Sequence, residues 1–81
     1  MFQLSIISLE KIEYRDKVSA LICPGVEGEL TILKDHIPLI TPLKGGEISI
    51  KKNGKEDKIQ ILDGILEVKK EETVILITKQ R

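Results

Sequence analysis

The stretch from residue 47 to residue 62 constrains the fold most, because two alternating apolar runs flank an Asn-Gly pair. In EISIKK (47–52) and DKIQIL (57–62), two isoleucines stand two positions apart, with a polar residue between them. Such alternation places the isoleucines on one face of a β-strand. Asn53 and Gly54 tolerate the positive φ that a two-residue hairpin loop requires. The stretch therefore predicts a β-hairpin with its isoleucines turned toward a core.

The remaining apolar runs are short, β-branched and separated by turn residues. Fourteen isoleucines and four valines favour strands over helices, and the three-to-four spacing of an amphipathic helix is lacking. Asp63-Gly64 suggests a second turn. Further strands are expected at 2–9, 17–23, 29–33, 38–41, 65–70 and 73–78. The pattern predicts an all-β protein, a sandwich or a barrel, and 81 residues allow one domain, residues 1–81.

Composition excludes several kinds of partner. Thirteen basic and thirteen acidic side chains cancel, so nothing draws the chain toward nucleic acid. Phe2 and Tyr14 are the two aromatic residues, too few for a stacking platform. The single cysteine, Cys23, fits a reducing compartment. The sequence carries neither a signal-peptide pattern nor a run of about 20 apolar residues.

No group of residues indicates catalysis, a metal or a cofactor. Asp35 and His36 are neighbours whose side chains point apart, whereas a general base must be aimed at a substrate. Cys23 sits in an apolar run, where a thiol is usually inert. One histidine and one cysteine are too few for a zinc site. Around Gly25 and Gly28, carboxylates stand where a phosphate cradle needs amides and a lysine. No helix follows Lys44-Gly45-Gly46 to supply a dipole, so we expect no enzyme here.

A protein-binding surface is what remains. In PGVEGEL (24–30) the glycines permit a sharp turn, and Glu27 and Glu29 project from it. The run HIPLIT (36–41) follows at once. This mixture suits a docking patch, but the residues alone leave an alternative open, in which the glutamates serve solubility and three apolar residues are core. These are Ile37, Leu39 and Ile40.

The same segments carry a family resemblance. PGVEGELTIL (24–33), HIPLITPLKGG (36–46) and DGILEV (63–68) follow in order after MFQLSIISLE (1–10). In this they resemble the N-terminal β-sandwich domain of the epsilon subunit of F-type ATP synthase. The resemblance spans essentially the whole chain. It implies a flattened β-sandwich of about ten strands.

The resemblance also implies a role and its contact residues. The domain is expected to be a non-catalytic part of the central stalk, or rotor, linking the gamma subunit to the membrane c-ring and coupling ion translocation to ATP synthesis. The expected contacts with the c-ring are Glu27, Glu29, Leu30 and Thr31. The expected contacts with gamma are Ser8, His36 and Thr41.

The implied location is the cytoplasmic face of the cell inner membrane, peripheral and bound only through the complex. Without the resemblance, the alternative is a free-standing β-sandwich adaptor for another protein. Members of the family usually continue into a C-terminal helical hairpin that inhibits hydrolysis and in some cases binds ATP. This chain ends at Arg81, where the hairpin would begin, so neither property is expected of it.

Three positions depart from the family pattern. Thr31 and Asp63 stand where glycine is usual, and Lys34-Asp35 replaces Pro-Gly before His36. Each change alters local turn chemistry without breaking the apolar alternation. The strand pattern should therefore be retained.

Overall fold

The computed structural model describes residues 1–80, and these form eight strands and no helix. The strands are β1 (Phe2–Ser8), β2 (Ile12–Val18), β3 (Ala20–Gly25), β4 (Gly28–Ile32), β5 (Leu39–Leu43), β6 (Gly46–Lys52), β7 (Lys55–Val68) and β8 (Glu72–Gln80). The all-β prediction is confirmed, whereas the expected number of about ten strands is too high. Arg81, where a helical part would begin, lies outside the described residues.

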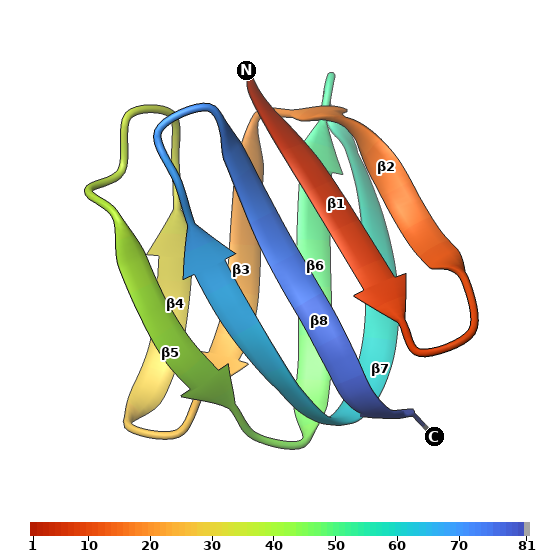
Figure 1. Cartoon of the computed structure of the whole chain (residues 1–81). Helices are drawn as coiled ribbons and strands as arrows, with labels where there is room; N and C mark the ends of the chain where they lie inside the picture. The colour runs from red at the N-terminus through yellow and green to blue at the C-terminus, as the bar shows by residue number, and fades with distance from the viewer. Residues whose placement is uncertain (81) are drawn as a thin grey trace.

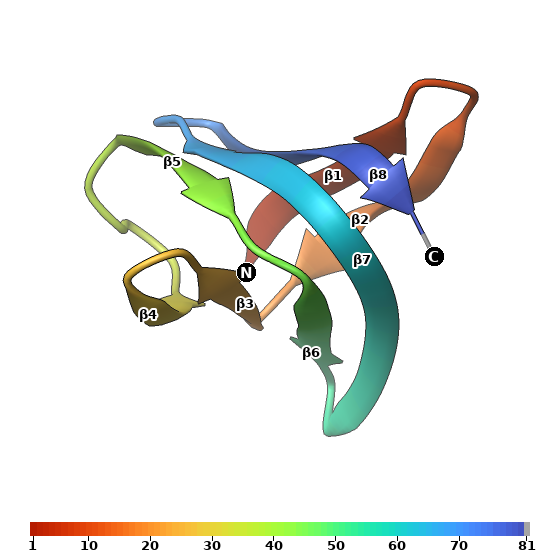
Figure 2. The ribbon, with the colours of Figure 1, turned by 90° about the horizontal axis from the view of Figure 1, so that it is seen from below.

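A single long strand, β7, joins the two layers of the sandwich. Its first half pairs with β6, from Lys52↔Lys55 to Gly46↔Ile61, and its second half lies between β5 and β8. One layer, here called the β1 layer, therefore has the order β2-β1-β8-β7-β5. The other, the β3 layer, consists of β4, β3, β6 and the first half of β7. Figure 1 shows the β1 layer in front, and Figure 2 shows β7 curving from one layer into the other.

The turn predicted at Asp63-Gly64 is wrong. β7 continues through these residues for 14 positions, and its register with β8 shifts on either side of Asp63. Such a shift marks a β-bulge, which bends a strand and increases its twist. The Asp-Gly pair thus bends β7 between the layers instead of ending it, which is one reason for the smaller number of strands.

A second correction concerns residues 12 to 23. The run 17–23 was expected to be one strand, but Val18 ends β2 and Ala20 begins β3, with Ser19 between them. The break at Ser19 shifts the alternation of inward side chains. Val18, Leu21 and Cys23 are therefore buried, instead of every second residue from 18 onward. β2 itself was not predicted, because its sequence IEYRDKV is dominated by polar side chains.

The core lies between the layers and consists of aliphatic side chains. Leu4 and Ile6 of β1 and Ile75 and Ile77 of β8 are almost fully buried, in the alternation of strands with one inward face. The hairpin predicted at Asn53-Gly54 is confirmed by positive φ at both residues. The other buried apolar residues are Val18, Leu21, Cys23, Ile32, Leu43, Ile48, Ile50, Ile61, Leu66 and Val68.

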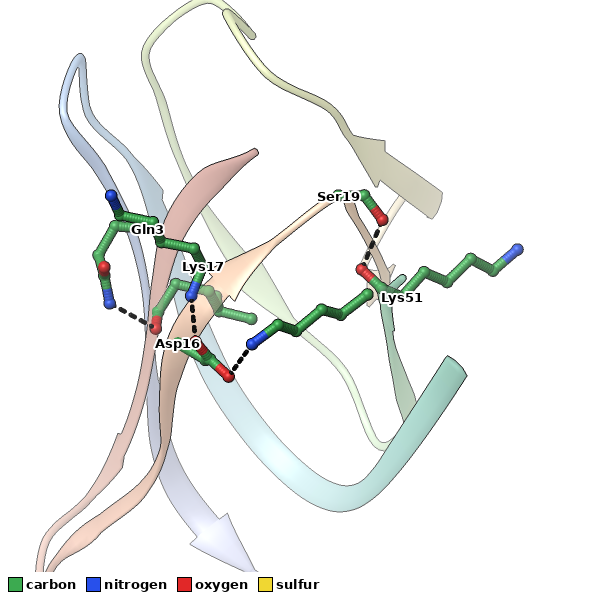
Figure 3. A network of polar contacts seen from close by, with 7 residues as sticks. Gln3, Asp16, Lys17, Ser19 and Lys51 are labelled. Atoms are coloured by element: carbon green, nitrogen blue, oxygen red, sulfur yellow. Dashed lines mark hydrogen bonds and ion pairs between the residues drawn. The ribbon is translucent and has the colours of Figure 1, made fainter. Parts of the chain in front are cut away.

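The layers also meet at a polar seam, where β2 lies beside β6 (Figure 3). The backbone N–H and the hydroxyl of Ser19 both donate to the carbonyl oxygen of Lys51, each at 2.8 Å. One residue further on, the Lys52 ammonium group donates to a carboxylate oxygen of Asp16. This seam connects the edge of the β1 layer to the middle of the β3 layer.

Candidate partner-binding surfaces

The predicted acidic turn is a tight hairpin loop between β3 and β4. Gly25 pairs with Gly28, which leaves Val26 and Glu27 as the exposed tip. A side chain at Gly25 would place its Cβ 2.7 Å from the carbonyl oxygen of Gly28, so only glycine lets the two strands approach so closely here. The carboxylates of Glu27 and Glu29 are both exposed. The turn thus presents two negative charges on a rigid frame.

A hollow of about 260 Å³ lies between this turn and β5. Its lining contains Glu27, Glu29, Leu30 and Thr41, together with Leu39, which was not among the residues expected to contact the c-ring or gamma. Three residues expected at the c-ring and one expected at gamma therefore meet at one place. The fourth residue expected at the c-ring, Thr31, is exposed on β4, one position beyond Leu30.

The other two residues expected at gamma lie far from each other. Ser8 ends β1, where its hydroxyl donates to the carbonyl oxygen of Lys11 at 3.2 Å and accepts from the backbone N–H of Glu10 and of Lys11. His36 lies in the β4–β5 loop beside Phe2, at the start of β1. A seven-residue strand separates the two places, so Ser8 and His36 cannot touch one small partner segment together.

The apolar run after His36 is surface and not core. Ile37 is 75% exposed and Ile40 is 70% exposed, whereas Leu39 is half-buried and packs against the core. The alternative in which all three are core is therefore wrong for two of them. Exposed isoleucines at such positions leave an apolar surface available for contact with another protein.

The groups that could perform chemistry are not arranged for it. Burial raises the pKa of the Cys23 thiol to about 11, with the Glu29 charge adding to the effect, so at neutral pH this group is not a thiolate nucleophile. His36 Nδ1 lies 2.8 Å from the carbonyl oxygen of Ile37. Within residues 1–80, no cluster of three or more potential metal ligands occurs. In the same part of the chain, no helix is available to cross a membrane.

These observations define a class of protein: a small two-layered β-sandwich with an exposed acidic turn and exposed isoleucines beside it. Residues 1–80 match the family described as ATP synthase, delta/epsilon chain, beta-sandwich domain. The chain belongs to this family, and the resemblance inferred from the sequence is confirmed.

Sequence relatives agree with this assignment. The chain is 36% identical over 74 residues to the ATP synthase epsilon chain of Desulforamulus reducens, covering 91% of this chain and 56% of the relative. It is 39% identical over 75 residues to the epsilon chain of Caldicellulosiruptor saccharolyticus, covering 93% of this chain and 55% of the relative. The chain thus spans little more than half the length of these relatives.

Solved structures share the fold. A chain of the Euglena gracilis mitochondrial ATP synthase, in a structure of OSCP, F1 and c-ring, superposes with a TM-score of 0.90 at 20% identity, over 99% of this chain and 52% of that chain. A chain of the Tetrahymena thermophila mitochondrial ATP synthase, in a structure of central stalk and c-ring, gives a TM-score of 0.82 at 15% identity, over 96% of this chain and 63% of that chain.

Proposed function

We propose that this chain is a non-catalytic rotor subunit of an F-type ATP synthase, linking the gamma subunit to the c-ring. The observation that carries the proposal is the family match, which extends over residues 1–80. The Tetrahymena chain of the same fold comes from a structure of central stalk and c-ring, which supports a place in the stalk. In this role, residues 1–81 act as one domain that transmits torque.

The fold suits a component that must rotate without deforming. Two layers share β7, and the Lys52–Asp16 and Ser19–Lys51 contacts connect them again at the polar seam. Backbone ladders that continue from one layer into the other resist relative sliding of the layers. A stiff spacer of this kind passes a twisting force between two partners with little loss.

The c-ring side is assigned to the acidic turn. Glu27 and Glu29 are exposed on a hairpin whose geometry Gly25 fixes, and Leu30 and Thr31 continue the same edge. Carboxylates at the rim of an interface give orientation and specificity more than raw affinity. The gamma side is assigned to Ser8, His36 and Thr41, which lie at different places on the fold and so require an extended contact.

The implied location follows from the partners. Attached to a membrane-embedded ring, the chain is a peripheral protein on the cytoplasmic face of the cell inner membrane and contacts the membrane only through the complex. Neither catalysis nor a bound cofactor forms part of this role.

Reconstitution tests the proposal. The chain is mixed separately with the gamma subunit and with detergent-solubilised c-ring from the same organism, and each mixture is captured through the partner. We expect stoichiometric capture by gamma and measurable capture by the ring. Absence of the chain from both captures would reject a rotor role and would favour a free-standing adaptor.

A further inference from the structure

The chain contains a single asparagine, Asn53, and a glycine follows it. In an Asn-Gly pair the backbone nitrogen of the glycine can attack the carbon of the side-chain amide, because a glycine without Cβ does not crowd the approach. The backbone must rotate to bring these two atoms together. Reaction at this pair therefore depends on how firmly the fold holds it.

The pair lies at the tip of the β6–β7 hairpin, beyond the last paired residues of both strands. Lys52↔Lys55 is the final pair of the ladder, and Asn53 and Gly54 have φ of 49° and 77°. Figure 2 shows this tip projecting from the body of the sandwich. Both residues are exposed, and a Cβ at Gly54 would meet no atom within 4 Å. The tip therefore has room to rearrange, and a local opening there breaks few contacts.

The other pair with this chemistry, Asp63-Gly64, is held in the middle of β7. Gly64 is buried and pairs with both Leu43 of β5 and Ile77 of β8. Its backbone N–H donates to a carboxylate oxygen of Asp63 at 3.0 Å, and a Cβ there would lie 3.0 Å from the carbonyl oxygen of Leu76. Rotation of this backbone would require β7 to separate from both neighbouring strands, which breaks many backbone hydrogen bonds.

Charged side chains of both signs surround the hairpin tip. Asn53 lines a hollow of about 320 Å³ in which two ammonium groups balance two carboxylates. The other residues of this hollow are Tyr14, Asp16, Lys52, Lys55 and Asp57. A third carboxylate at position 53 would make the hollow negative and would compete with Asp16 for the ammonium group of Lys52.

We propose that Asn53 is a deamidation site of the folded chain, converted to aspartate and isoaspartate, while the Asp63-Gly64 pair stays unchanged. The Gly54 nitrogen forms a bond to Cγ of Asn53, and the side-chain nitrogen leaves as ammonia with the proton that the Gly54 nitrogen gives up. Water then opens the resulting succinimide ring at either carbonyl, which gives aspartate or isoaspartate. One water is consumed for each ammonia released, and nothing is oxidised or reduced.

Both products loosen the connection between the two layers. Isoaspartate adds a methylene group to the backbone of the turn, so a two-residue loop no longer joins Lys52 and Lys55 in their register. Aspartate keeps the turn but places a carboxylate next to Lys52, whose ammonium group donates to Asp16 at the polar seam. The hairpin tip is therefore a site of ageing, at which a slow reaction with water weakens the seam.

The test compares the folded chain with the chain unfolded in urea, during incubation in the same mildly alkaline buffer. Digestion after glutamate in mild acid separates residues 48–56, which contain Asn53, from residues 57–67, which contain Asp63. Mass spectrometry measures loss of the amide, and enzymatic methylation of isoaspartate measures isomerisation at each site. Asn53→Gly is the matched control, because glycine tolerates the same positive φ and carries no side-chain amide.

We expect the folded chain to lose the amide of Asn53 at a rate within about tenfold of the rate in urea, because only the hairpin tip must open. Isomerisation at Asp63 should be slower in the folded chain by about a hundredfold or more, since two strands must separate from β7. Incubated wild type should show a lower midpoint of thermal unfolding, and incubated Asn53→Gly should not. Intact Asn53 in the folded chain after the urea sample has reacted would overturn the inference. Equal isomerisation at both sites of the folded chain, or an unchanged midpoint after Asn53 has reacted, would also overturn it.

Discussion

Lys52 of β6 donates a hydrogen bond to Asp16 of β2, and this pair connects the two layers of the sandwich at the polar seam (Figure 3). The bond from Lys52, followed by one from the backbone N–H of Lys17, lowers the pKa of the Asp16 carboxyl below its ordinary value. The same bond raises the pKa of Lys52. The stability of the seam therefore depends on pH in a direction that can be calculated.

The first prediction concerns acid and base unfolding. A carboxyl whose pKa is lower in the folded state stabilises it above the unfolded pKa, near 4, and loses this effect as pH falls through the folded pKa. Lys52 has a raised pKa, so its contribution is present below the unfolded value, near 10.5, and is lost as pH rises through the folded pKa. We expect Asp16→Asn to remove part of the decline of the unfolding free energy below pH 4, measured by urea titrations.

The matched control is Glu56→Gln, which neutralises an exposed carboxylate near the tip of the β6–β7 hairpin. Both members of the Asp16–Lys52 pair are substantially exposed, so the effect should be small and should decrease with added salt. Identical dependence of the unfolding free energy on acid pH in wild type and Asp16→Asn would show that the Asp16–Lys52 pair does not contribute to stability.

The second prediction concerns Gly25. Its replacement by alanine would bring a Cβ within 2.7 Å of the Gly28 carbonyl oxygen and 3.0 Å of a Leu30 methyl group. The hairpin must open to relieve this clash, so Gly25→Ala should lower the free energy of unfolding by about 1–3 kcal/mol, as other overpacked sites do. Chemical denaturation measures the loss, and Val26→Ala at the exposed tip is the control. Equal stability of Gly25→Ala and wild type would mean that the turn is not so tightly constrained.

The third prediction concerns the thiol of Cys23. Because burial raises its pKa to about 11, its alkylation by iodoacetamide at pH 8 should be much slower in the folded protein than in urea. A cysteine at exposed Thr31, on the neighbouring strand, is the control and should react at the rate of a free thiol. The raised pKa also predicts that stability declines as pH rises from about 9 toward 11, a decline that Cys23→Ala should lack. Fast labelling of folded Cys23 would contradict its burial.

The fourth prediction concerns the acidic turn. The double variant Glu27→Lys with Glu29→Lys reverses both exposed charges and should weaken attachment to the c-ring, while surface sites of this kind alter stability by only about 0.5 kcal/mol. The control pair, Glu56→Lys with Glu71→Lys, makes the same change of charge near the β6–β7 and β7–β8 connections. These connections lie at the opposite end of the sandwich from the β3–β4 turn (Figure 1). If both double variants bind the ring equally well, the turn is not the c-ring edge.

Alternation of apolar side chains was sufficient to predict most strands, because one inward face selects every second residue. Ile48 and Ile50 are buried as the pattern requires, and the Asn53-Gly54 turn is where its chemistry places it. Asp63-Gly64 has the same chemistry, yet β7 runs through it because β5 and β8 pair with the residues that follow. Tertiary pairing thus decided between a turn and a bulge.

The candidate surfaces were only partly predictable from the sequence. The exposed turn at Glu27 and Glu29 follows from glycine positions alone, because the constraint is local. The hollow that unites this turn with Leu39 and Thr41 depends on how β4 and β5 sit in space.

Retention of the gamma subunit on an immobilised c-ring shows directly whether the chain holds these two rotor parts together. Gamma is applied to the ring with and without the chain, and the amount retained after washing is quantified. We expect the chain to increase the retention of gamma, and the double variant Glu27→Lys with Glu29→Lys to reduce this increase. Equal retention of gamma with and without the wild-type chain would contradict this expectation.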